Sequence, residues 1–370
     1  MNYLLQQTDL TLKRIKQLTP QNIDTKEFLR NVLDQQLENL SDNVSLGIPV
    51  IGKKELYSSA RFAVEDIDAP EKLLSEFQEG IPQVLGVIEW LLRPSFPLKG
   101  GYFDHPSSGP WVELSNDLVV DIEKAICRLD IQINNYSPFQ IGTGFVVGKD
   151  AQNRALIMTN MHVIEGAQQL GWLNSAFVTL GCAFERYSLT STDKLYPLLN
   201  LYEKHSSYDL ALVYLQLEDA ENIASRTNIL NLSTLPPDSI NGIKIGVIGH
   251  PYFDSRLDPF PKYYGFGDEF GIKRFSPGEL KELNNREWHQ QLIEIMVHDA
   301  ATLSGSSGSC IFDLQTKSVL GLHFGGWQMP NKTLVSTLSG DIYAQLFYDN
   351  GAVPLWKLVN EPILKEANYN

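Results

Sequence analysis

The sequence predicts a multidomain protein in which a small all-α domain precedes an all-β barrel or sandwich that closes with one helix. Over the first 93 residues, apolar side chains recur three and four positions apart, as they do on one face of a helix. Proline and glycine then crowd the next stretch. Beyond it, short runs rich in β-branched and aromatic residues follow one another closely, which is typical of strands.

Composition narrows the class of protein. The chain has 370 residues, of which 43% are apolar, and this suffices for two or three domains with ordinary cores. A net charge of −14 without any run of lysine and arginine predicts no nucleic-acid partner. The N-terminus lacks the apolar centre of a signal peptide, so we expect a cytoplasmic protein with no membrane partner. Three widely spaced cysteines predict reduced, mostly buried thiols.

Two amphipathic segments justify the helical domain. Asp24 followed by Glu27 has the pattern of a helix start, and it precedes an apolar stripe that runs to residue 40. A second stripe over residues 71–92 is interrupted by Gly80 and Pro82, which predicts two helices with the proline in the first turn of the second. Nothing in these segments suggests chemistry.

A boundary follows the helices. Residues 94–115 contain more prolines and glycines than a helix or a central strand tolerates. We therefore predict a helical regulatory or adaptor domain over residues 1–93, a linker over residues 94–115 and a β domain over residues 116–370. Within the β domain, runs such as GTGFVVG, LALVYLQL and SVLGLHFGG supply the strands, and AVPLWKLVNEPILKEA has the length for one closing helix.

Three residues next to predicted strands have side chains suited to nucleophilic catalysis. His162 follows the apolar run ALIMT, Asp209 precedes LALVYL, and Ser307 stands in GSSGS before CIF. Singly, each has a simpler interpretation, as a core or surface histidine, a strand-capping aspartate and a turn serine. Together they supply what a serine nucleophile needs, namely a base for its proton and a carboxylate that orients the base. The other histidines have no metal-ligand spacing, so we expect neither a metal nor a cofactor.

Five blocks in order, GTGFVV, TNMHV, YDLALV, GSSGS and GLHFGG, resemble the signature blocks of bacterial trypsin-like, chymotrypsin-fold serine peptidases over about residues 120–360. The resemblance implies two six-stranded β-barrels with a catalytic triad in the cleft between them. It makes His162 the general base, Asp209 its orienting partner and Ser307 the nucleophile. The N–H groups of Gly305 and Ser307 would form the oxyanion hole, and glycine at 305 permits the backbone geometry that such a hole requires.

Substrate preference follows from the same resemblance. His323 and Thr302 stand where glutamyl endopeptidases and viral 3C-type proteases contact a Glu or Gln at P1, the residue before the cleaved bond. Imidazole and hydroxyl groups suit such an oxygen-bearing side chain. Ala301 stands where trypsins carry the aspartate that binds Lys or Arg, which disfavours a basic preference. The alternative for His323 is a buried imidazole bonded inside the barrel.

Ser306 replaces the aspartate that pairs with a newly cut N-terminus in secreted trypsins, so activation by trimming is not expected. We expect instead that the helical domain regulates the peptidase by binding a protein partner. The architecture resembles effectors of bacterial conflict or antiviral defence systems. Two alternatives stay open: a catalytically silent, protease-like module that binds peptides, and a quality-control protease of the HtrA type, for which the chain after the barrel is too short to hold a PDZ domain.

Overall fold

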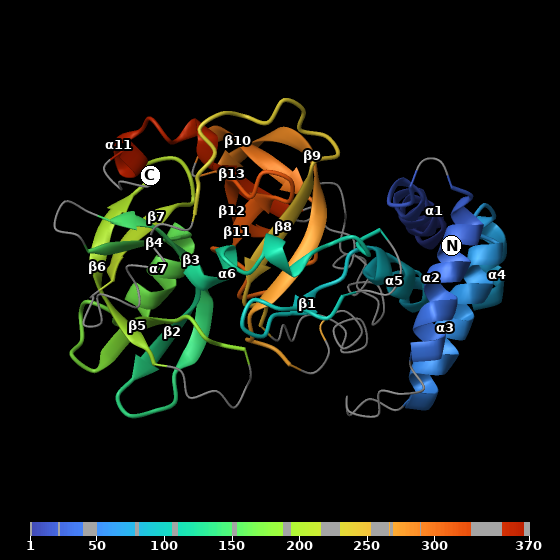
Figure 1. The fold of residues 1–370 in the computed structure, drawn as a ribbon, viewed down its shortest axis with the longest axis horizontal. Coiled ribbons are helices and arrows are strands. Elements are labelled where there is room, and N and C mark those ends of the chain that lie inside the picture. The colour runs from blue at the N-terminus through green and yellow to red at the C-terminus, as the bar shows by residue number, and fades with distance from the viewer. Residues whose placement is uncertain are drawn as a thin grey trace.

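Helices precede strands in the computed structural model of this chain (Figure 1). The residues that it describes are 2–20, 23–39, 50–77, 81–105, 110–149, 154–187, 194–215, 230–252, 266, 269–288, 290–326 and 350–365.

The N-terminal helices form a bundle with a core of its own. They are α1 (Asn2–Gln17), α2 (Thr25–Asn39), α3 (Val50–Glu65), α4 (Pro70–Phe77) and α5 (Ile81–Leu92). Asp24 caps α2 as the sequence predicts, because its carboxylate accepts the backbone N–H of Glu27 at 2.8 Å. The core includes Leu29, Leu33, Ala60 and Leu73 and shares no member with the two other apolar clusters. Figure 1 shows this helical bundle on one side of the strands.

Six strands close into a first barrel in the order β2-β3-β4-β7-β6-β5. Their bounds are β2 (Ile126–Ile133), β3 (Phe139–Lys149), β4 (Ala155–Thr159), β5 (Val178–Ala183), β6 (Tyr196–Lys204) and β7 (Ala211–Leu215). Every residue of β4 is buried, which agrees with its unbroken apolar sequence ALIMT. The helix α7 (Met161–Gln169) leaves the end of β4.

The remaining strands form a second sheet in the order β1-β9-β10-β13-β12-β11-β8. They are β1 (Phe96–Pro97), β8 (Lys244–Gly249), β9 (Arg274–Trp288), β10 (Gln291–His298), β11 (Cys310–Asp313), β12 (Val319–Gly326) and β13 (Asn350–Pro354). Pairing of β8 with β9 closes six of these strands into a ring. The predicted fold class is therefore confirmed: helices precede a chymotrypsin-like pair of β structures. The three cysteines lie in β2, β5 and β11, free and buried as expected.

The Pro/Gly-rich stretch after the helical bundle lies against the second sheet. Strand β1 pairs with β9, and Leu98 and Trp111 are almost fully buried. Short helices η2 (Asn116–Leu118) and α6 (Ile122–Ala125) then lead into β2. None of the helices in the described residues is both long and apolar enough to span a membrane.

The closing helix is shorter than the sequence predicts. Residues 352–354 belong to β13, the next turn is η3 (Leu355–Lys357), and within the described residues the helix α11 covers Pro362–Lys365. Two prolines explain the difference. Pro354 ends the strand, and Pro362 starts a new helix because a proline within a longer helix would clash with the preceding turn.

Candidate active site

Paired strands bring His162 and Asp209 together. Thr159, the last residue of β4, lies opposite Ala211, the first residue of β7, so the residues just outside these two strand ends are neighbours. His162 Nδ1 lies 2.6 Å from Asp209 Oδ2, and the backbone N–H of His162 donates to Asp209 Oδ1 at 3.0 Å. Asn160 donates from its side chain to the Asp209 carbonyl at 2.8 Å.

This arrangement fixes the imidazole ring. Only 3% of the Asp209 side chain is exposed, against 41% of the His162 side chain. A buried carboxylate that accepts from both the backbone and Nδ1 holds one tautomer and one ring orientation. The ring nitrogen Nε2 is then the one left for a second partner on the exposed side.

Ser307 lies in a loop that both β structures hold. Its carbonyl accepts the Thr143 N–H of β3 at 2.8 Å, and Gly308 donates to the His323 carbonyl of β12 at the same distance. The Ser307 hydroxyl bonds to the Phe324 carbonyl at 3.4 Å, and among the described residues it makes no hydrogen bond to His162. Such bonds are often long or absent before substrate binds, so this geometry is compatible with a catalytic Ser307.

Two glycines shape the loop around Ser307. Gly305 and Gly308 have φ values of +86° and +89°, in the left-handed region that favours glycine. A Cβ atom at Gly308 would lie 1.9 Å from the Thr143 carbonyl oxygen, so no other residue fits there. The Gly305 carbonyl accepts the Thr143 hydroxyl at 2.8 Å. Within the described part of the chain, the N–H groups of Gly305 and Ser307 donate to no protein acceptor, which leaves both available to an oxyanion.

His323 is buried on β12 beside a second histidine. His323 Nδ1 lies 3.2 Å from Nε2 of His298, the last residue of β10. Burial lowers the pKa of His298 from its ordinary value to about 4. Burial also lowers the pKa of His323 well below its ordinary value, and the nearby His298 and His162 lower it further. Both rings are therefore neutral at pH 7, and one of them donates to the other.

Thr302 is held by the last strand. Its hydroxyl donates to Asn350 Oδ1 at 2.8 Å, and the Asn350 side chain donates to the Ala300 carbonyl at 2.8 Å. Asn350 belongs to β13, which pairs with the strand β12 that carries His323. Thr302 and His323 thus stand on connected elements of the second sheet.

Comparison with known proteins identifies the enzyme class. The trypsin-like peptidase domain family matches residues 142–322, a range that includes His162, Asp209 and Ser307. Residues 142–322 therefore carry a trypsin-like peptidase domain, and the chain is a serine endopeptidase. Its substrate is accordingly a protein or a peptide.

Two further comparisons found similar proteins. A probable serine protease of Lysobacter enzymogenes is 26% identical over 328 residues, which cover 80% of this chain and 82% of that protein. The solved structure of the Rv3671c protease from M. tuberculosis, in its active form, is 16% identical at a TM-score of 0.39. That match covers 68% of this chain and 83% of the other.

Sequence reasoning did not find all the residues around the site of this peptidase. His298 and Asn350 contact His323 and Thr302 directly, yet neither stands in a recognisable motif. Thr143 does stand in the GTGFVV block, but its contact with Gly305 joins residues 162 positions apart. A lone histidine at the end of an apolar strand was the only available signal for His298.

Proposed function

We propose that the peptidase hydrolyses peptide bonds through an acyl-enzyme, with Ser307 as nucleophile, His162 as general base and Asp209 as the group that orients His162. The observation that carries this proposal is the double contact of Asp209 with the backbone and the ring of His162. A buried carboxylate in that position stabilises the imidazolium that forms when the base takes a proton.

Each step then uses a named group. The Ser307 hydroxyl oxygen attacks the substrate carbonyl carbon while its proton passes to His162 Nε2. The N–H groups of Gly305 and Ser307 bind the oxygen on which negative charge develops. His162 returns the proton to the leaving amine, and the amine departs as the acyl-enzyme forms. Water then attacks the ester while His162 takes its proton, and His162 passes that proton to the Ser307 oxygen as the acid is released.

Non-additive kinetics test the triad. Because the three groups act as one unit, we expect Ser307→Ala and His162→Ala each to lower kcat by about 10⁴-fold or more. The double variant should lose little beyond either single variant. The test uses a peptide substrate and equal concentrations of each variant, with protein concentration measured by a method that does not depend on activity. Multiplicative losses would show that the two residues do not share one step.

We also propose that His323 and Thr302 form the S1 subsite for Glu or Gln, as in glutamyl endopeptidases. Two neutral, adjacent imidazoles support this role. If His298 Nε2–H donates to His323 Nδ1, then His323 Nε2–H remains as a donor for a P1 side-chain oxygen. A neutral donor suits the Gln amide directly, whereas a Glu carboxylate would draw a proton onto His323.

Cleavage after Glu and after Gln separates these cases. A bound Glu carboxylate raises the pKa of His323, so its binding strengthens as the pH falls. The ratio of kcat/KM for P1 Glu to that for P1 Gln should therefore rise between pH 8 and pH 5.5. A peptide library varied at P1 gives the measurement. Preferred cleavage after Lys, Arg or large aromatic residues would contradict the assignment of Thr302 and His323.

The competing candidate is a silent peptide-binding module. The observation in its favour is that the Ser307 hydroxyl bonds to Phe324 and not to His162 in this structure. Peptide binding without turnover, by a chain whose serine resists an active-site reagent, would establish that candidate. No feature of the described residues favours an HtrA-type role over regulated proteolysis.

We propose that residues 1–93 form a regulatory domain and that residues 94–115 connect it to the peptidase. The separate core of the helical bundle supports this division. In this proposal a protein partner binds the bundle and controls cleavage in the cytoplasm, in a bacterial defence pathway. Phage challenge of cells that express the wild type or Ser307→Ala tests it. Equal survival of the two would remove the defence role and leave the peptidase chemistry standing.

A further inference from the structure

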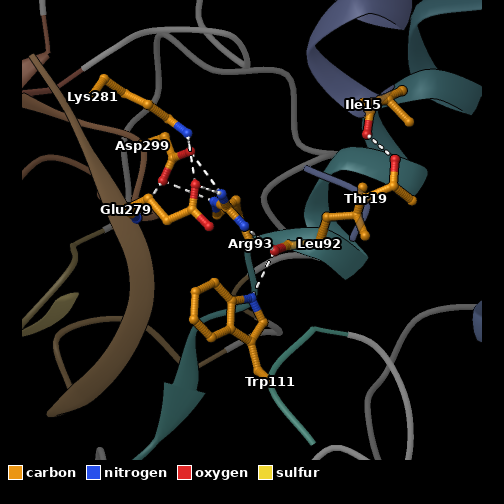
Figure 2. Close-up of polar contacts among 8 residues, drawn as sticks. All are labelled: Ile15, Thr19, Leu92, Arg93, Trp111, Glu279, Lys281 and Asp299. Atoms are coloured by element: carbon orange, nitrogen blue, oxygen red, sulfur yellow. Dashed lines mark hydrogen bonds and ion pairs between the residues drawn. The ribbon is translucent and has the colours of Figure 1, made fainter. Parts of the chain in front are cut away.

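The helical bundle is joined to the peptidase by a buried ion pair at the end of α5. Arg93, the residue after that helix, is 4% exposed. Its Nη2 donates to Asp299 Oδ2 at 2.8 Å, and its Nε lies 2.8 Å from Asp299 Oδ1 (Figure 2). The two residues are 206 positions apart in the sequence.

A second contact fixes the same helix end. The Trp111 indole N–H donates to the Leu92 carbonyl at 2.7 Å, and Arg93 Nη1 donates to that carbonyl at 2.9 Å. The Arg93 guanidinium lies 5.2 Å from the centre of the Trp111 ring. Figure 2 shows the arginine between the end of α5 and the strands of the second sheet. The direction of α5 and the position of the guanidinium are therefore linked.

Asp299 belongs to the segment that carries the proposed S1 subsite. It follows His298, which contacts His323, and stands three positions before Thr302. Glu279 of β9 exchanges two hydrogen bonds with it, from Asp299 N–H to the Glu279 carbonyl at 3.2 Å and from Glu279 N–H to Asp299 Oδ1 at 2.8 Å. The neighbouring Ala300 packs tightly against Gly278 of β9, since a Cβ at Gly278 would lie 2.6 Å from the Ala300 nitrogen.

The charges in this cluster balance only when Arg93 is present. Lys281 Nζ lies 2.7 Å from Asp299 Oδ2 and 3.1 Å from Glu279 Oε2, so two cations face two carboxylates. Burial alone would raise the pKa of Asp299, but Arg93 and Lys281 outweigh burial and lower it below its ordinary value. Withdrawal of Arg93 would leave two buried or half-buried carboxylates with one cation, and such an imbalance is costly inside a protein.

We propose that Arg93 is a positioning residue through which the helical bundle sets the S1 subsite, by holding Asp299 and hence the segment from His298 to Thr302. The inference rests on the proposed function of that subsite. In this account, a partner that moves α5 loosens or tightens the hold of Arg93 on Asp299. The bundle then changes P1 selectivity without touching Ser307 or His162.

Substitution of the two cations in the full chain tests the positioning role. Arg93→Gln should lower the selectivity for P1 Glu or Gln over P1 Ala by at least tenfold, mostly through KM. Lys281→Gln is the matched control, because it removes a charge from the same carboxylate but from within β9. It should change selectivity by less than threefold, because the Lys281 side chain is 28% exposed and water can replace its charge, whereas that of Arg93 is 5% exposed. Arg93→Lys keeps the charge but not the two-nitrogen contact of the guanidinium with the carboxylate. It should therefore lose less selectivity than Arg93→Gln.

A double-mutant cycle tests the link to the bundle. Leu85→Ala loosens the buried face of α5, where Leu85 is 2% exposed. This change should alter P1 selectivity in the wild-type background and have little further effect when Arg93→Gln is already present. Equal effects of Leu85→Ala in both backgrounds would show that the bundle does not act through Arg93. Unchanged selectivity in Arg93→Gln would overturn the positioning role itself.

Hydrogen exchange tests the coupling between Arg93 and the S1 segment without relying on peptide cleavage. In the Ser307→Ala chain, hydrogen exchange of residues 298–303 should be at least tenfold faster with Arg93→Gln than without it, and Lys281→Gln should have a smaller effect. Faster exchange with no cleavage by the parent chain would uphold the coupling and contradict the peptidase proposal. Unchanged exchange would overturn the coupling whether or not the parent chain cleaves peptides.

Discussion

At the scale of single residues, the site depends on hydrogen bonds that hold reactive groups in place. Asp209 fixes the ring of His162 through two contacts, and Thr143 holds the Gly305 carbonyl through a third. None of these groups needs to change its bonding as charge develops on the substrate. Such preorganisation is the main source of electrostatic catalysis.

Replacing the orienting carboxylate tests this view. Asp209→Asn keeps the size of the side chain but can place an amide N–H against His162 Nδ1. The ring proton then sits on Nε2, and Nε2 can no longer accept the proton of Ser307. We expect kcat to fall by about 10⁴-fold at neutral pH, with a small change in KM. Steady-state kinetics on a peptide substrate give the result. A loss below tenfold would mean that Asp209 does not orient the base.

Thr143 gives a smaller and more specific prediction. Thr143→Val removes the hydroxyl that binds the Gly305 carbonyl but keeps the volume of the side chain. The oxyanion loop should lose one hydrogen bond, which lowers kcat by about tenfold and leaves KM nearly unchanged. Thr143→Ser retains the hydroxyl and serves as the control. A rise in KM without a fall in kcat would contradict this role.

At the scale of secondary-structure elements, strand ends position several of the residues proposed for catalysis and for substrate binding. His162 and Asp209 lie at paired ends of β4 and β7, whereas β10 ends at His298 next to Asp299. The second sheet thus brings a neutral imidazole pair and a charged cluster to adjacent positions. Neighbouring residues on one strand end face different environments because side chains alternate across a strand.

The strand end at His298 predicts a pH dependence of stability. Burial lowers the pKa of His298 to about 4, while the unfolded chain titrates near its ordinary value of 6.5. Between these values the unfolded state binds the proton and the folded state does not, so stability rises with pH from 4 to 6.5. His298→Gln should flatten that slope, as measured by urea unfolding of the Ser307→Ala chain. The groups facing this ring are His323 and the adjacent Asp299.

Local sequence patterns predicted some elements and missed others for physical reasons. The start of α2 and the buried strand β4 follow from Asp24 and from the run ALIMT, whose signals lie within a few residues. Helix α3 was not singled out, because two of its four described buried residues are alanines, which give a weak apolar pattern. The pair between Arg93 and Asp299 has no local signal at all, since it joins distant parts of the chain.

The proposed catalytic residues have local sequence signals. His162, Asp209 and Ser307 stand in short motifs, so the sequence was enough to propose them together. Thr143 and His298 contact Gly305 and His323 through three-dimensional packing, which a single sequence does not reveal.

At the scale of the whole molecule, the bundle has an apolar core separate from those of the β structures, which predicts two separable unfolding steps. The bundle core contains Leu29, whereas Leu98 of the connecting stretch belongs to a core of the β structures. Each substitution to alanine should cost its own unit about 2–5 kcal/mol. Leu29→Ala should therefore lower the bundle transition and Leu98→Ala the peptidase transition, as followed by hydrogen exchange during unfolding. If either variant lowered the stability of both units equally, the chain would unfold as one cooperative unit.

The central claim, that Ser307 is the nucleophile, is tested most directly by the intact mass of the chain after treatment with a fluorophosphonate. We predict one adduct per chain, located at Ser307 and absent from Ser307→Ala. Ser304→Ala, from the same loop, should label as the wild type does. Labelling that persists in Ser307→Ala, or that never occurs in a chain that cleaves peptides, would contradict the account.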